Sequence, residues 1–89
     1  MTCVAPHVPV PQTDHVRLTW LAPHSGVRCR VLAWTCHCRS VIYELCASGG
    51  QVYLRRTIQG DSPTVQETSR MCTTEGHDLW TAVLTGRAR

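Results

Sequence analysis

Cysteine and histidine side chains gather near the middle of the chain and are the first candidates for chemistry. The cluster comprises Cys29, Cys36, His37, Cys38 and Cys46. A structural zinc site needs four nitrogen or sulfur ligands that converge on one point, and common sites supply them as paired C-x2-C knuckles. Here the spacing is C-x-C without a second pair, and Cys29 and Cys36 would face opposite sides of a straight strand because their separation is odd. We therefore expect no metal or other cofactor and interpret the thiols as small apolar core residues.

The segment after Cys36 keeps a zinc-stabilised structural module open as an alternative. Residues 37–40 must form a turn if the flanking strands pair, yet they contain no Gly, Pro, Asn or Asp. A metal held in the Cys36/Cys38 region would explain such a bend. Core packing that forces the turn is the competing explanation.

Catalysis has less support from the residue pattern. A nucleophilic cysteine needs a base within hydrogen-bond reach, whereas Cys36 and its neighbour His37 would point to opposite faces of a strand. The chain contains no Gly-x-Ser-x-Gly, P-loop or dinucleotide-binding fingerprint. We expect that the protein is not an enzyme, and a small thiol enzyme is the least favoured alternative.

An arginine-rich strand surface is the best candidate for binding a partner. It comprises Tyr53, Arg55, Arg56 and Arg70. An aromatic ring beside arginines on a strand can stack on bases and hold phosphates, and both residue types are favoured at protein interfaces. The competing interpretation is an ordinary salt bridge between Arg55 and Glu44 across a hairpin. The leading hypothesis is a small non-enzymatic regulatory or accessory protein that binds a macromolecule, either protein or nucleic acid.

The elements that would position this surface are two strands, 41–46 and 51–58, joined by a two-residue turn at either Ser48-Gly49 or Gly49-Gly50. Glycine adopts the positive φ angles of a two-residue turn at little cost. Alternation then assigns one face to the core and the other to solvent. The core face holds Val41, Tyr43, Leu45, Val52, Leu54 and Ile58, and the solvent face holds Ile42, Glu44, Tyr53, Arg55 and Thr57.

The remaining pattern predicts further strands at 15–21, 27–36 and 64–69, the last at a sheet edge with Gln66 and Glu67 exposed. The turn at 37–40 would align Leu32 with Leu45 and Trp34 with Tyr43. A helix begins near Thr73 and ends before Gly86. The predicted fold class is α+β: a small antiparallel sheet of four to five hairpin-connected strands with one C-terminal helix packed on one face.

Composition limits the other possibilities. The 89 residues include nine arginines and no lysine, with a net charge of +3, which permits an acidic partner without requiring one. We expect residues 1–14 to form a Pro-rich extended or disordered lead and residues 15–89 a single domain. The chain has neither a secretory signal nor an apolar run long enough for a membrane, so we expect a cytoplasmic protein without a membrane partner. A homodimer formed through the edge strand is a further hypothesis.

Overall fold

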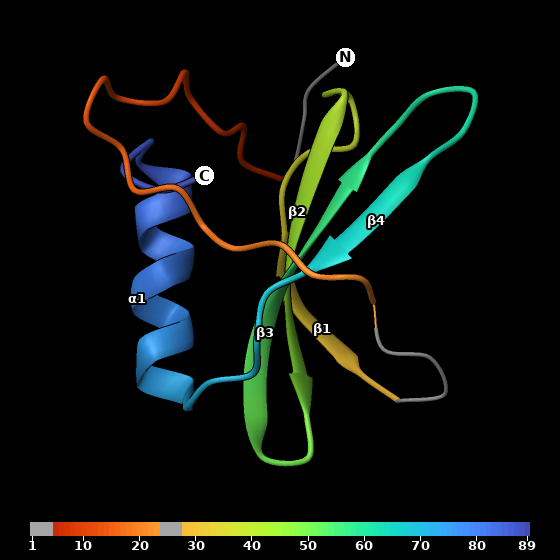
Figure 1. Ribbon diagram of the computed structural model, residues 1–89, viewed down its shortest axis with the longest axis vertical. Coiled ribbons are helices and arrows are strands. Elements are labelled where there is room, and N and C mark those ends of the chain that lie inside the picture. The colour runs from red at the N-terminus through yellow and green to blue at the C-terminus, as the bar shows by residue number, and fades with distance from the viewer. Residues whose placement is uncertain (1–4, 24–27) are drawn as a thin grey trace.

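The computed structural model describes residues 5–23 and 28–89, which form one antiparallel sheet and one helix (Figure 1). The sheet has four strands in the order β1-β2-β3-β4. Their bounds are Arg30–Trp34 for β1, Val41–Ser48 for β2, Gln51–Ile58 for β3 and Thr64–Glu67 for β4, and the helix α1 spans Thr73–Leu84. The predicted α+β class is confirmed. No helix within the described ranges is long and apolar enough to cross a membrane.

The β2–β3 hairpin forms as predicted, in one of the two registers that the sequence leaves open. Ser48 pairs with Gln51 and Leu45 with Leu54, so Gly49 and Gly50 are the two turn residues. Their φ angles are +59° and +80°, as a two-residue turn between twisted strands requires.

The helix α1 packs on the predicted core face, beside β3 (Figure 1). It begins after Cys72, which makes no capping bond through its side chain, and Gly86 follows it with a φ of +77°. The buried core between helix and sheet consists of Tyr43, Leu45, Val52, Leu54, Trp80, Val83 and Ala88. Burial of this apolar face is what holds the helix on the sheet.

The strand predicted at 15–21 is wrong. The backbone of this segment pairs with two different partners, because Val16 forms an isolated bridge with Ala88 and Leu21 forms another with Glu67. The amide of Val16 donates to the carbonyl of Arg87 at 2.8 Å. Because its two ends pair with different parts of the chain, the segment does not form a continuous β-ladder with one partner strand. Its alternation of apolar and polar residues is nevertheless typical of a strand.

The edge strands also differ from the prediction. A bulge between Val31 and Ala33 shifts the β1 register, so Ala33 lies opposite Leu45 and Trp34 opposite Glu44. Leu32 and Trp34 are consequently exposed, at 36% and 50%. In β4, the predicted exposure of Glu67 is wrong as well.

Glu67 is only 4% exposed, because it lies opposite Arg55 and its backbone bonds to Leu21. The end of β4 is therefore enclosed on both sides, by Arg55 of β3 on one side and by Leu21 on the other.

The Pro-rich lead is described from residue 5 onward, and it lies in extended form beside the C-terminal end of α1 (Figure 1). The amide of Gln12 donates to the carbonyl of Gly86 at 2.8 Å, and the amide of Cys36 donates to the carbonyl of Pro6 at 2.8 Å. Val8 packs against the core. Residues 6–12 therefore bridge the turn after β1 and the C-terminus.

Candidate functional site

Tyr53 lies on the face opposite the helix, as predicted, but it does not face water. The residue is 2% exposed, and the guanidinium of Arg70 lies 4.6 Å from the centre of its ring. The predicted solvent exposure of Tyr53 is therefore wrong, since Arg70 covers the ring that was expected to stack on a partner.

Arg55 forms the cross-strand salt bridge of the competing interpretation. Its Nε donates to Glu44 Oε1 at 2.9 Å, and its second nitrogen approaches the Cys29 sulfur at 3.6 Å. The hydrogen bond with Glu44 raises the pKa of Arg55 above its usual value. This guanidinium is already engaged within the fold.

Arg56 lies on the other face of the sheet, because consecutive strand residues alternate. Its guanidinium stacks on the ring of Trp20 at 4.3 Å and donates to Gln66 Oε1. The four residues predicted as one binding surface are thus divided between two faces. Each of them contacts its own neighbours in the fold.

Two of the thiols lie beside Tyr53: Cys46 is buried and Cys29 is half-buried. Burial raises the pKa of Cys46 to about 12, so this thiol is neutral at physiological pH. The Tyr53 hydroxyl, which bonds to the Cys29 sulfur, holds the pKa of Cys29 below its usual value, and the nearby charge of Arg55 acts in the same direction. Burial in turn raises the pKa of Tyr53. Cys29 and Cys46 are free thiols in this cluster.

The turn after β1 brings the two cysteines of the C-x-C pair together. The thiol of Cys36 donates to the Cys38 sulfur at 3.2 Å. The bend needs no turn-favouring residue, because the side-chain amide of Gln59 donates to the carbonyls of His37 at 3.1 Å and Arg39 at 2.7 Å. His37 contributes its backbone to this turn, while the imidazole beside the cysteines belongs to His7. This group, His7 with Cys36 and Cys38, could hold a metal.

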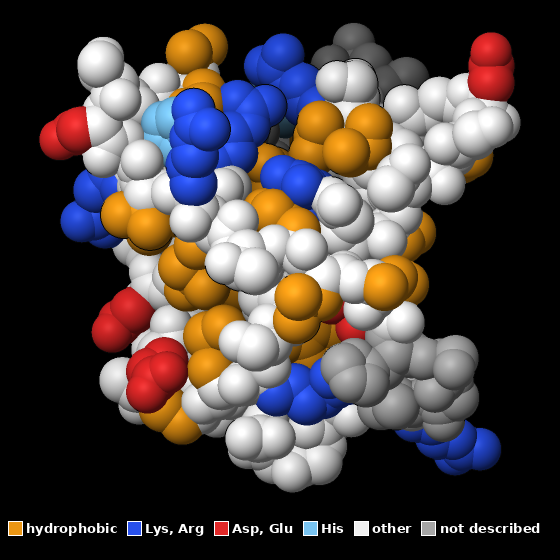
Figure 2. All heavy atoms as spheres, in the orientation of Figure 1, with side chains coloured by type: hydrophobic (Ala, Val, Ile, Leu, Met, Phe, Trp, Pro, Cys, Tyr) orange, Lys and Arg blue, Asp and Glu red, His pale blue; other side chains and the backbone are white. Residues whose placement is uncertain are grey.

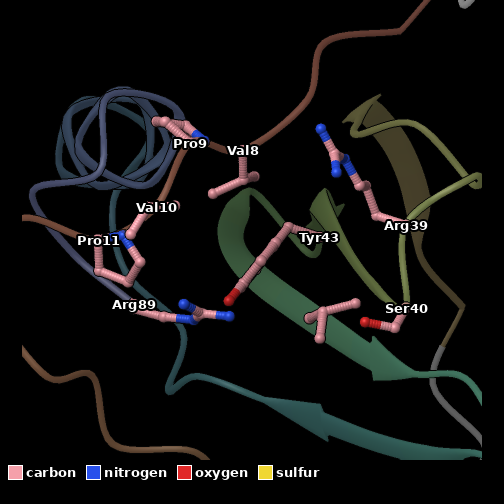
Figure 3. Close-up of a pocket in the computed structure, with 9 residues that line it drawn as sticks. Val8, Pro9, Val10, Pro11, Arg39, Ser40, Tyr43 and Arg89 are labelled. Atoms are coloured by element: carbon pink, nitrogen blue, oxygen red, sulfur yellow. The ribbon is translucent and has the colours of Figure 1, made fainter.

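A pocket of about 470 Å³ opens between the lead and the sheet (Figure 3). Three segments far apart in the sequence build it: the lead, residues 39–43 at the start of β2, and the C-terminus. Its lining consists of Val8, Pro9, Val10, Pro11, Arg39, Ser40, Val41, Tyr43 and Arg89. The pocket is therefore walled by apolar side chains and has two guanidinium groups at its rim.

The hydroxyl of Tyr43 is the distinctive polar atom of this pocket. Tyr43 is 1% exposed, and its hydroxyl has no hydrogen-bond partner among the described residues. Figure 3 shows the side chain extending across the pocket so that the hydroxyl points toward the guanidinium of Arg89. A buried hydroxyl without a partner costs about 1–3 kcal/mol, so this position favours a ligand that supplies an acceptor.

The surface around the pocket is positively charged. Arg39 and Arg89 are both exposed. Figure 2 shows arginine side chains gathered at the end of the molecule where the lead meets the C-terminus, with hydrophobic side chains beside them. The Tyr43 hydroxyl and the Arg89 guanidinium, which lie side by side in Figure 3, are hydrogen-bond donors of the kind that suits a carboxylate or a phosphate. Sequence reasoning missed this site because Val8 and Arg89 become neighbours only when the lead docks.

Comparison with protein-family models, curated proteins and solved structures finds no match.

Proposed function

We propose that this protein is a small, non-enzymatic accessory module that binds an acidic segment of a protein partner in the pocket between the lead and the sheet. The observation that carries the proposal is the buried Tyr43 hydroxyl, which lacks a partner among the described residues and points toward Arg89. A carboxylate placed between them would accept from the hydroxyl and pair with the guanidinium.

The composition of the pocket supports a peptide with one acidic and several apolar side chains. Arg39 and Arg89 supply two positive charges, and Ser40 adds a hydroxyl at the rim. Val8, Val10 and Val41 contribute apolar walls. An acidic side chain flanked by leucine-like residues would satisfy both parts of this lining.

A protein partner fits better than a single-stranded nucleic acid. Such strands are held by stacking of successive bases on exposed aromatic rings. The aromatic ring of the pocket, Tyr43, is 1% exposed, and Tyr53 on the opposite face is 2% exposed. Arg55 is also engaged by Glu44. We therefore place the binding surface at the pocket rather than on the face around Tyr53.

A cytoplasmic location is part of the proposal. Cys29, Cys46 and Cys72 are free thiols, and a reducing compartment keeps thiols in this state.

The test is a titration of the ¹⁵N-labelled protein with the peptide N-acetyl-Leu-Glu-Leu-amide, followed by NMR. We expect saturable shifts of the amides of Ser40, Val41 and Tyr43. Arg39→Gln and Arg89→Gln should each weaken binding about tenfold, because each removes a charge-assisted hydrogen bond. Tyr43→Phe should weaken binding without lowering the free energy of unfolding, since the lost hydroxyl had no partner among the described residues.

The control variant is Arg30→Gln. It removes the same charge from an exposed residue of β1, whose strand partner Ala47 lies near the other end of the hairpin. Binding of the same peptide with Gln in place of Glu should be at least tenfold weaker. An equal loss of peptide affinity in Arg30→Gln and Arg89→Gln would contradict the proposal. It would also be contradicted if an oligouridine strand shifted the same amides and bound more tightly than the peptide.

A further inference from the structure

The turn after β1 and the lead bring three metal-ligating side chains to one point. The ligand atoms of His7, Cys36 and Cys38 all lie within 4.8 Å of one another. They come from segments about thirty residues apart, so the sequence spacing alone does not reveal the group. We propose that these three residues bind a zinc ion, which fastens the lead to the turn between β1 and β2.

The distances fit one central cation. The sulfurs of Cys36 and Cys38 are 3.2 Å apart, and the Cys38 sulfur is 3.2 Å from Nε2 of His7. In tetrahedral zinc sites the Zn–S bond is about 2.3 Å and the Zn–N bond about 2.0–2.1 Å, which separates neighbouring ligands by roughly 3.5–3.8 Å. A small outward movement of the side chains therefore accommodates the ion.

The backbone around the group is held in place before any ion binds. The amide of Cys36 donates to the carbonyl of Pro6, which fixes the residue next to His7 against the end of β1. Gln59 holds the carbonyls of His37 and Arg39 and thereby the bend between the cysteines. Cys36 is buried, whereas His7 and Cys38 are exposed, so the site is open to solvent on one side. Such a site admits an ion without unfolding of the sheet.

The type of ligand selects the metal. Two thiolates and an imidazole suit Zn²⁺, whereas Ca²⁺ and Mg²⁺ require oxygen ligands. Binding converts both thiols to thiolates, so the two displaced protons pass to the solvent. The three residues leave one coordination position for water or another ligand.

The zinc ion would link the lead, through His7, to the turn after β1, through Cys36 and Cys38. Val8 follows His7 directly and lines the pocket, so an ion at His7 also steadies one wall of that pocket. The metal site rests on its own ligands and does not depend on the proposed peptide binding. Either proposal can fail alone.

The test is titration of the reduced full-length protein with Co²⁺, a spectroscopic substitute for Zn²⁺, followed by competition with Zn²⁺. We expect one equivalent of Co²⁺ to produce a thiolate-to-metal charge-transfer band, which Zn²⁺ then abolishes. Loss of a ligand in His7→Ala or Cys38→Ser should weaken binding by at least about 100-fold. Zinc should also raise the melting temperature of the unaltered protein, because it binds the folded state.

The matched controls are Cys72→Ser, which removes an exposed thiol outside the group, and His77→Ala, which removes an exposed imidazole on α1. Both should bind Co²⁺ like the unaltered protein. The metal-free melting temperatures of His7→Ala and Cys38→Ser should match that of the unaltered protein, since both residues are exposed. Absence of a thiolate band, or unchanged affinity in His7→Ala, would overturn the zinc site.

Discussion

Replacement of Trp80 by alanine should destabilise the protein by about 3–5 kcal/mol. Trp80 is 8% exposed and packs in the core between α1 and the sheet. A domain of 89 residues has a free energy of unfolding of roughly 4–13 kcal/mol, so the substitution removes a large share of it. The melting temperature should fall by about 20 °C in thermal unfolding followed by circular dichroism.

Trp34→Ala is the matched control for this prediction. Trp34 is the last residue of β1, and its side chain is 50% exposed. Its replacement should cost less than about 1 kcal/mol, because much of the ring already contacts water. If the two variants melt at the same temperature, the packing of α1 on the sheet is not the main source of stability.

Gly76→Ala should destabilise the protein by about 1–3 kcal/mol, although alanine normally stabilises a helix interior by about 1 kcal/mol relative to glycine. Gly76 is buried in α1 and lies against Val52 of β3. A methyl group on Gly76 would collide with the Cγ2 atom of Val52. Val52 is a β-branched strand residue and cannot rotate away freely. Urea unfolding measures the change.

A second substitution shows whether this collision is the cause. Val52→Ala removes the atom that the new methyl group meets, so the double variant should recover at least about 1 kcal/mol relative to the sum of the two single effects. Gly60→Ala serves as the control, because nothing lies within 4 Å of an added methyl group there. Additive effects of Gly76→Ala and Val52→Ala would contradict the close contact of α1 and β3.

Local patterns sufficed to predict the central elements of the fold. The pairing of β2 with β3 follows from alternation and from Gly49 and Gly50, which favour a turn, whereas the choice between the two registers does not. The helix follows from its apolar stripe and from Gly86 after its end. These signals act within a few residues, which is why one sequence is enough to find them.

The errors concern residues whose surroundings come from distant segments. Period-two alternation at Val16 cannot reveal that its backbone partner is the C-terminus, and the bulge in β1 leaves no clear mark in the sequence. Tyr53 has the alternation of a solvent-facing residue, but Arg70 covers it after the chain turns back. A local sequence pattern does not predict that a side chain from a distant segment will cover a residue.

The pocket and the metal group were missed for the same reason. Both depend on docking of the Pro-rich lead, whose composition is typical of an extended or disordered segment. The C-x-C pair drew attention to Cys36 and Cys38, but their imidazole partner is His7 rather than the adjacent His37. The contact between Pro6 and Cys36 is what brings this histidine to the thiols.

Docking of the lead is the claim on which both proposed sites depend, and amide hydrogen exchange measures it most directly. The amide of Cys36 donates to the carbonyl of Pro6, and the amide of Gln12 donates to the carbonyl of Gly86, each at 2.8 Å. We expect both amides to exchange at least about 100-fold more slowly than in an unstructured peptide. Exchange of both at the unstructured rate, while the Leu54 amide in β3 stays protected, would contradict the docked lead and with it both sites.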